Sequence, residues 1–180
     1  MDIRLEPLAP GHFAGLHRVF DRVCRERRWL LFTEGGTLES ASAYYRSVLD
    51  GGHIHRVALR GDEVLGWCDI LGQAPETRRH VGLLGMALAP EARGQGLGRA
   101  LIGAALAEAD ARGLRRVELS VHADNRAAQA LYRRVGFETE GVLRGAWCLD
   151  GREADMLTMA RRAAPGAGDA AVDSAAGGGR

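Results

Sequence analysis

The sequence predicts an α/β protein built on one sheet whose strands run in both directions. Three observations lead to this class. A strand pair turns around Gly61-Asp62, a strand–helix–strand–helix run occupies residues 80–137, and a last strand pair turns at Asp150-Gly151. Hairpins make antiparallel neighbours, whereas a helix between two strands is typical of parallel ones, so one sheet of mixed direction is expected.

The elements before the first hairpin are a strand and two helices. The opening, MDIRLEPL, alternates apolar and polar residues and predicts a strand. Apolar residues recur at three- and four-residue intervals in 13–23 and again in 38–48, which predicts two helices with one apolar face each. Thr37 stands where the second helix needs an N-cap.

The first hairpin, HIHRVALRGDEVLGWCDI, occupies residues 53–70. His53 and His55 alternate on it, and since no third ligand is evident we interpret them as a surface or groove pair rather than a metal site. The strand HVGLLGMAL follows, and its Gly82 and Gly85 predict a β-bulge or a close approach of backbone.

The remaining elements follow in short order. A glycine-rich loop leads into a helix that ends near Gly113 as its C-cap. RRVELSV, residues 115–121, predicts a buried strand, and the next helix begins at Asn125 and ends where Gly136 suits a left-handed cap. Residues 137–159 close the domain as two strands.

Length and composition bound the class of protein. Of the 180 residues, 1–162 are expected to form one domain, and 163–180 a flexible tail rich in alanine and glycine. The net charge of +1 provides no excess of positive charge that would favour binding to nucleic acid or to an anionic membrane. No apolar stretch reaches membrane-span length, the start lacks a secretory pattern, and the three separated cysteines favour reduced thiols. A cytoplasmic protein is expected.

The loop RGQGLGR, which begins at Arg93, carries the first chemical signal. Gly94, Gly96 and Gly98 allow backbone N–H groups to turn inward, and the N-terminus of the following helix points at the same place. Arg93 and Arg99 can add positive charge at the rim. The pattern predicts a cradle for phosphate or pyrophosphate, although tight helix–sheet packing explains the glycines as well. The lysine and hydroxyl residue of the Walker pattern are missing, which disfavours a nucleoside triphosphate.

Two motifs, MALAPEARGQGLGRALI and VELSVHADNRAAQALYRRVGF, together resemble the GNAT superfamily of acyl-CoA-dependent N-acyltransferases. The residues that match are Arg93, Gly96, Gly98, Asn125, Leu131, Tyr132, Gly136 and Phe137. The resemblance covers residues 1–162. It implies a mixed, mostly antiparallel central sheet, flanked by helices, with two splayed strands; the splay is a reason for a bulge in LLGMAL.

The resemblance also implies acetyl-CoA as co-substrate, without a metal. Residues 93–99 would bind its pyrophosphate, the strand 84–88 would pair with its pantetheine arm, and Asn125 would contact or order that arm. Tyr132 would lie beside the thiol sulfur. The implied cofactor-binding residues are Met86, Ala87, Leu88, Arg93, Gly94, Gln95, Gly96, Leu97, Gly98, Arg99 and Asn125.

The chemistry that follows is attack of a neutral amine on the thioester carbonyl. A backbone N–H near Met86 or Ala87 could stabilise the oxyanion, and the phenol of Tyr132 is suited to protonate the leaving thiolate. A plain core aromatic is the alternative for Tyr132. The general base is open: the strand 80–88 has no acid, and Ser120 stands where some members of the superfamily carry one. The candidates for the base or the acceptor site are Glu34, Asp69, Ser120 and His122.

The C-terminal pattern, GFETEG through DGREADMLTM, is similar to the branch of ribosomal-protein N-terminal and small amino-acid or phosphinothricin acetyltransferases. It implies a primary amine of a small amino-acid-like molecule or a peptide N-terminus as acceptor. The residues that could line the acceptor end are Trp67, Asp69, His80, Trp147 and Asp155, with the two tryptophans equally suited to the core. A homodimer is compatible with the superfamily. The alternative function is an inactive acetyl-CoA sensor.

Overall fold

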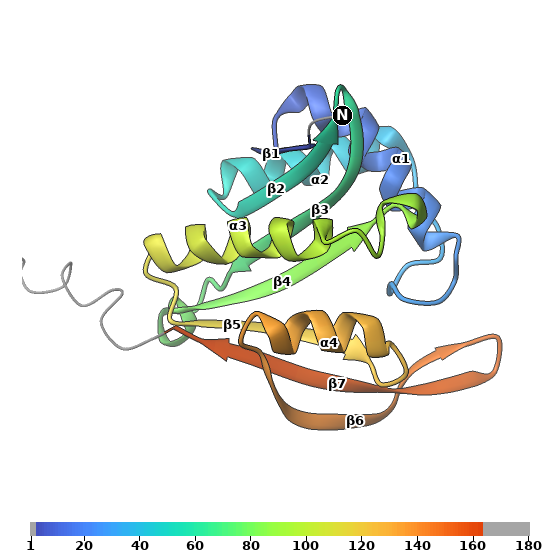
Figure 1. The fold of residues 1–180 in the computed structure, drawn as a ribbon, viewed down its shortest axis with the longest axis vertical. Helices are drawn as coiled ribbons and strands as arrows, with labels where there is room; N and C mark the ends of the chain where they lie inside the picture. Colours follow the sequence, from blue (N-terminus) through green and yellow to red (C-terminus); the bar gives the residue numbers. More distant parts are fainter. Residues whose placement is uncertain (1–2, 164–180) are drawn as a thin grey trace, which may run out of the picture.

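The computed structural model describes residues 3–163 and contains a seven-stranded sheet of order β1-β2-β3-β4-β5-β7-β6 (Figure 1). The paired strands are antiparallel except β4 and β5, which are parallel, so the expected mixed and mostly antiparallel sheet is confirmed. The strands are β1 (Ile3–Pro7), β2 (Ile54–Arg60), β3 (Glu63–Gly72), β4 (Val81–Leu88), β5 (Arg116–His122), β6 (Glu138–Leu149) and β7 (Arg152–Arg162).

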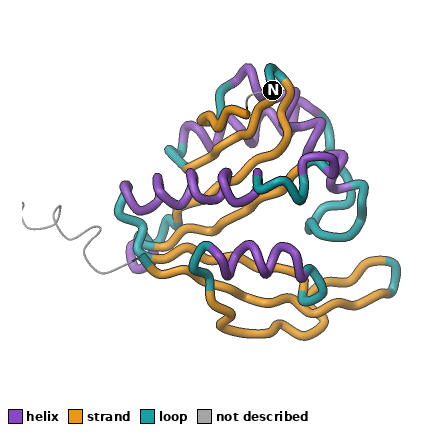
Figure 2. Tube along the Cα trace, viewed as in Figure 1, coloured by secondary structure: helices purple, strands orange, loops and turns teal. Residues whose placement is uncertain are grey.

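Four helices cover the two faces of the sheet (Figures 1 and 2). They are α1 (Phe13–Cys24), α2 (Leu38–Asp50), α3 (Leu97–Ala111) and α4 (Arg126–Arg134). Helices α3 and α4 share one face, where Gly98 of α3 lies against Leu131 of α4 and the Met86 side chain of β4. Helix α1 packs on the opposite face, where Phe20 meets Trp67 of β3. We call these the cofactor face and the acceptor face.

The residues that the sequence predicted as helix caps stand at the ends of the helices. Thr37 accepts a hydrogen bond from the N–H of Ser40 at the start of α2. Gly113 and Gly136, after α3 and α4, have φ of +77° and +93°, values that glycine adopts without strain. The predicted tail lies outside the described residues from 164 onward.

A β-bulge in β4, one of the two predictions for its glycines, is wrong. Strand β4 pairs with β3 without a shift in register, and the bulge of this region lies instead between β2 and β3, at Ala58 and Leu59. The other prediction, a close approach of backbone, is wrong as well, because the atoms nearest to these glycines belong to side chains. A Cβ on Gly82 would lie 2.4 Å from Cγ2 of Ile70, and one on Gly85 would lie 3.1 Å from Oδ1 of Asp69.

Strands β4 and β5 are nevertheless splayed. They pair only where Val81–Leu83 runs beside residues 116–118, and from Leu84 onward the two strands separate (Figure 1). The splay therefore needs no bulge, because each strand stays paired on its other side, β4 with β3 and β5 with β7.

His55 is a core residue, which corrects its interpretation as half of a surface or groove pair. Its side chain is 6% exposed, and neither ring nitrogen has a hydrogen-bond partner within residues 3–163. It stands opposite Asp69 in the β2–β3 register and edge-on to Tyr45. Burial lowers the pKa of His55 to about 4, so the imidazole is neutral in the folded protein.

We expect His55 to make the fold sensitive to acid. Between pH 6.5 and 4, His55 is protonated in the unfolded chain and neutral in the folded chain. Its contribution to the free energy of unfolding is therefore fully present above pH 6.5 and is lost as the pH falls. The titration of His55 alone should make the free energy of unfolding about 2 kcal/mol lower at pH 5 than at pH 7. Urea unfolding of His55→Leu should show a smaller acid loss than the parent, with the half-exposed His80→Leu as control. An unchanged acid loss in His55→Leu would contradict the assignment.

Candidate active site

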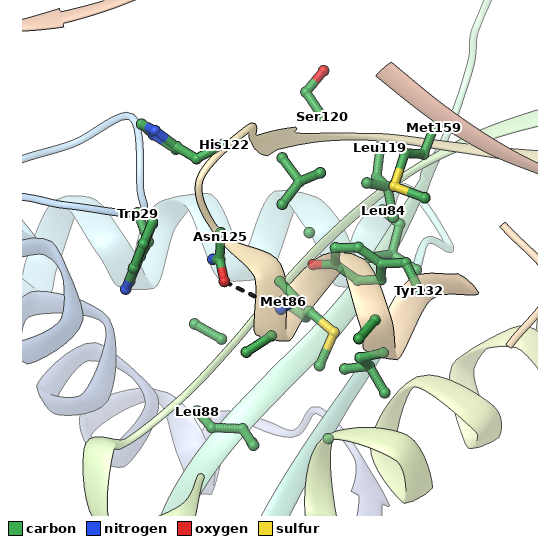
Figure 3. Close-up of a pocket in the computed structure, with 18 of the residues that line it drawn as sticks. Trp29, Leu84, Met86, Leu88, Leu119, Ser120, His122, Asn125, Tyr132 and Met159 are labelled. Carbon is green, nitrogen blue, oxygen red and sulfur yellow. Dashed lines mark hydrogen bonds between the residues drawn. The ribbon is translucent and has the colours of Figure 1, made fainter. Parts of the chain in front are cut away.

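A groove of about 1100 Å³ occupies the splay between β4 and β5 (Figure 3). Its walls come from the unpaired part of β4, the loop 93–99, β5 and α4. The groove reaches both faces of the sheet: Tyr132 and Leu88 line it on the cofactor face, and Leu83 and Ser120 line it on the acceptor face. Two reactants can therefore enter from opposite sides and meet between the strands.

The backbone of β4 offers unpaired polar groups to this groove. The N–H of Ala89 donates to β3, whereas the C=O of His80 accepts from the start of β5. Backbone direction alternates along a strand, so even-numbered residues of β4 face β5. Beyond the paired part, these are Leu84, Met86 and Leu88, which all line the groove. The N–H of Ala87 faces β3 instead, which corrects its place as an alternative oxyanion donor.

The glycine loop continues this edge into helix α3. Gly94 and Gly96 have φ of +74° and +80°, and a Cβ on either would meet nothing within 4 Å. Gly96 is the N-cap of α3, and the backbone bonds of the described residues leave the N–H groups of Leu97 and Gly98 without a carbonyl partner. The Gln95 side chain turns back to the carbonyl of residue 91. The loop is therefore an open set of donors beside the positive end of a helix.

Tight packing, the alternative explanation for the loop glycines, applies to Gly98. It is buried, and a Cβ there would lie 3.3 Å from the Leu131 side chain of α4. Close contact between α3 and α4 therefore requires Gly98, while Gly94 and Gly96 stay open to the groove.

Arg93 does not provide the free rim charge that the sequence suggested. Its guanidinium makes two hydrogen bonds to the Glu26 carboxylate, at 2.9 and 2.6 Å, and its Nε donates to the carbonyl of Leu88 at 3.0 Å. It joins the end of β4 to the segment after α1. Arg99 is exposed and lines the groove, and no ion pair of the described residues engages it, so it is an available cation at the rim; Arg134 of α4 is another.

Tyr132 and Asn125 are placed by α4. The Asn125 side chain accepts from the N–H of Ala128 at 3.1 Å and so caps the helix (Figure 3). The Tyr132 ring packs against Phe137, and its hydroxyl points into the groove beside Met86 (Figure 3). Burial raises the pKa of Tyr132 above its usual value, so the phenol is a proton donor at neutral pH.

The acceptor face of β5 carries Ser120 and His122, which both line the groove. His122 is 4% exposed and stands between Trp29 and Trp147, with ring centroids 5.8 and 4.9 Å away. Its Nε2 has no partner within the described chain, and burial lowers its pKa. Trp29 and His122 line the groove, and Trp147 packs against His122 without lining it.

Glu118 lies on the same face of β5, but its carboxylate is occupied by Arg116 at 2.6 Å and Arg78 at 2.8 Å. Burial raises the pKa of Glu118, and the two arginine hydrogen bonds outweigh this effect and lower it overall. Arg116 also binds Glu140. This ion-pair cluster lines the groove and had not been expected, because its members come from separate elements.

Several residues assigned to the acceptor end lie elsewhere. Glu34 is an exposed loop residue and is not part of the groove lining. Trp67 is buried against Phe20, and Asp155 accepts from the N–H of Gly145 within the β6–β7 hairpin. His80 precedes β4 at its paired end. Asp69 is buried beneath Gly85, one strand away from the groove.

Residues 3–163 contain neither a cluster of metal ligands nor a membrane-spanning helix. Three or more metal-ligating side chains do not cluster anywhere in this part of the chain. None of its helices combines the length and the apolarity needed to cross a bilayer. Cys24 and Cys68 are buried free thiols, and Cys148 is an exposed one.

Comparisons with known proteins agree with this geometry. Residues 20–137 match the profile of the acetyltransferase (GNAT) family. The N-alpha-acetyltransferase RimI of Mycobacterium tuberculosis is 38% identical, over 87% of this chain and 93% of that protein. The mycothiol acetyltransferase of Geodermatophilus obscurus is 42% identical over 48% of this chain, and the matched part spans only 29% of that protein. The crystal structure of a ribosomal-protein-alanine N-acetyltransferase from Brucella melitensis superposes with a TM-score of 0.84 at 25% identity, covering 89% of this chain and 99% of the other.

Proposed function

The chain belongs to the acetyltransferase (GNAT) family, and from this premise we propose that it transfers the acetyl group of acetyl-CoA to the α-amine of a peptide or of a small amino-acid-like molecule. The observation that carries the proposal is the unpaired edge of β4, which leads directly into the open glycine loop. An extended ligand with amides in its arm and a pyrophosphate at its end fits that sequence of donors.

In this proposal the pyrophosphate lies on the loop at Gly94–Gly98, with Arg99 at its rim, and the pantetheine arm runs beside β4 as an additional strand. The C=O of Met86 and the N–H of Leu88 are then the backbone partners of the arm, because the Leu88 carbonyl already accepts from Arg93. Asn125 has its carbonyl oxygen committed to the helix cap, so its amide N–H₂ is the group that remains for the ligand.

The reaction then needs one bond made and one broken. The amine nitrogen attacks the thioester carbonyl, and an even-numbered N–H of β4, that of Met86, stabilises the oxyanion. As the C–S bond breaks, the Tyr132 hydroxyl gives its proton to the departing thiolate. The alternative of an inactive acetyl-CoA sensor is not favoured, because the Tyr132 hydroxyl, the open edge and the acceptor-side entrance are all present.

Peptide N-termini are favoured as acceptors by two arguments. RimI and the Brucella enzyme are named as N-alpha- and ribosomal-protein-alanine acetyltransferases. An α-amine, with a pKa of about 7.7–8.0, is roughly one-third neutral at pH 7.5, whereas a lysine amine is roughly 0.1% neutral. At this pH an α-amine is therefore available for attack far more often than a lysine amine.

We expect a peptide that begins with alanine to be acetylated at its N-terminus, and free small amino acids to react as well. The same peptide with a blocked N-terminus and an internal lysine should be inert. Release of CoA thiol, with the acetylated position located by mass spectrometry, measures both. Reaction at internal lysines alone would contradict the proposal. Acetyl-CoA binding without thiol release for any amine would favour the sensor.

A cytoplasmic location and a homodimer belong to the same proposal and remain predictions. The cofactor is a cytoplasmic metabolite, which supports the first. Cell fractionation tests the location, and light scattering of the purified protein tests the oligomeric state.

A further inference from the structure

The two strands that border the groove supply no free carboxylate to the acceptor face. On β4 the residues on this face are Leu83, Gly85 and Ala87. Their register partners on β3 lie on the same face. On β5 it carries Ser120, and the one nearby acid is bound by two arginines. If the acceptor amine gives up its proton to a side chain, that side chain must come from another element.

Asp69, on the neighbouring strand β3, has the carboxylate that the two bordering strands lack. It is the register partner of Gly85, and a Cβ on Gly85 would lie 3.1 Å from Oδ1 and 3.5 Å from Oδ2 of Asp69. Both carboxylate oxygens thus occupy the space that a side chain of β4 would fill. Gly85 lines the groove and Asp69 does not; with no side chain at Gly85, the carboxylate lies directly behind this part of the groove wall.

The surroundings of Asp69 hold it in place without neutralising it. The indole Nε1 of Trp67 donates to Oδ1 at 3.0 Å. Within residues 3–163 no arginine, lysine or histidine lies within ion-pair distance of its carboxylate. The side chain is 9% exposed. A buried carboxylate with only neutral donors around it is a poor stabilising element and a good proton acceptor.

We propose that Asp69 is the general base of the reaction, acting over Gly85 from the acceptor face while Tyr132 acts from the cofactor face. The inference rests on the proposed function. As the N–C bond forms, the amine proton passes to the Asp69 carboxylate. The C–S electron pair stays on sulfur and takes the Tyr132 proton. Solvent then returns one proton from Asp69 to the phenolate, so the products are the amide and CoA thiol.

The ionisation of Asp69 suits this role. Burial raises its pKa to about 7, although the hydrogen bonds from Trp67 and from backbone oppose the shift. The titratable groups around it stay neutral near that pH: burial raises the pKa values of Tyr44 and Tyr45 on α2 and lowers that of His55 on β2 to about 4. On β3 itself, burial raises the pKa of Cys68. Across the groove, burial lowers the pKa of His122.

The test compares kcat/KM of the parent and of Asp69→Asn from pH 5.5 to 8.5, with one amine acceptor. Asparagine keeps the shape and can still accept from Trp67. Titration of the acceptor affects both proteins equally and cancels in their ratio. The parent-to-variant ratio should be only a few-fold at the lowest pH, rise through about pH 7, and level off near about 10²-fold. Acetyl-CoA affinity, measured by calorimetry, should be unchanged.

Two further variants sharpen the result. Gly85→Ala places a methyl group against the carboxylate and should lower kcat with little effect on acetyl-CoA affinity. Glu34→Gln removes an exposed loop acid and should behave as the parent. A ratio that stays near one at every pH, or that is large but independent of pH, overturns the role of Asp69. A parent that binds acetyl-CoA and acetylates no amine overturns the proposed function, and this inference with it.

Discussion

Gly96→Val is expected to lower the affinity for acetyl-CoA by at least about 10²-fold, because two or more charge-assisted backbone hydrogen bonds contribute about 1.5–3 kcal/mol each. Gly96 has a φ of +80° and caps α3, and the space beside it is open to the groove. A branched side chain would be strained in this conformation and would also stand where the pyrophosphate approaches the backbone. Isothermal calorimetry with acetyl-CoA measures the loss.

The control for this variant is Gly103→Ala, on the same helix. Gly103 has an ordinary φ and open space around it, so alanine should leave binding unchanged and stabilise α3 slightly. Acetyl-pantetheine, which lacks the pyrophosphate, separates the cradle from general damage to the loop. Its turnover should be similarly weak with the parent and with Gly96→Val. Calorimetry that shows unchanged CoA affinity in Gly96→Val would remove the loop from the cofactor site.

Tyr132→Phe is expected to lower kcat by about 10²- to 10³-fold, the lower half of the range for a lost general acid, since water can replace the phenol in part. Phenylalanine keeps the ring contact with Phe137, so the fold and the groove should persist. The Tyr132 hydroxyl has no hydrogen-bond partner among the described residues, and its removal therefore strands no buried group. Single-turnover measurements report the chemical step directly.

The pattern of the kinetic constants distinguishes an acid from a core aromatic. Loss of an interaction made only in the transition state lowers kcat and kcat/KM together and leaves the acetyl-CoA dissociation constant unchanged. A structural Tyr132 would instead show a lower melting temperature and weaker binding. If Tyr132→Phe turns over like the parent while chemistry limits the rate, another group or solvent delivers the proton.

Local signals predicted the elements well because each is decided by a few neighbouring residues. The Thr37 cap, the left-handed Gly113 and the turn at Asp150-Gly151 all stand where the sequence placed them. The bulge in β4 failed for the opposite reason. Gly82 is explained by the Ile70 side chain on the neighbouring strand, and such a contact leaves no mark in the residues around it.

The site residues also differ in how far local sequence could predict them. The glycine loop and Tyr132 belong to contiguous motifs and could be read from the chain. The partners of Arg93 and Gly85 could not: Glu26 is 67 residues from Arg93, and Asp69 meets Gly85 only through the register of β3 with β4. The sequence left the base open, and the residue that we propose for it, Asp69, stands on a strand that does not border the groove.

The splay has a consequence for the protein without its cofactor. The backbone of Met86 and the N–H of Leu88 form an internal strand edge that acetyl-CoA is proposed to complete. By mass action, a ligand at about 100 times its dissociation constant stabilises a folded chain by about 2.7 kcal/mol. The melting temperature should therefore rise with the logarithm of the acetyl-CoA concentration. A cell that runs short of acetyl donor would hold this enzyme in its least protected form, so the supply of the donor would set the protein's lifetime as well as its rate.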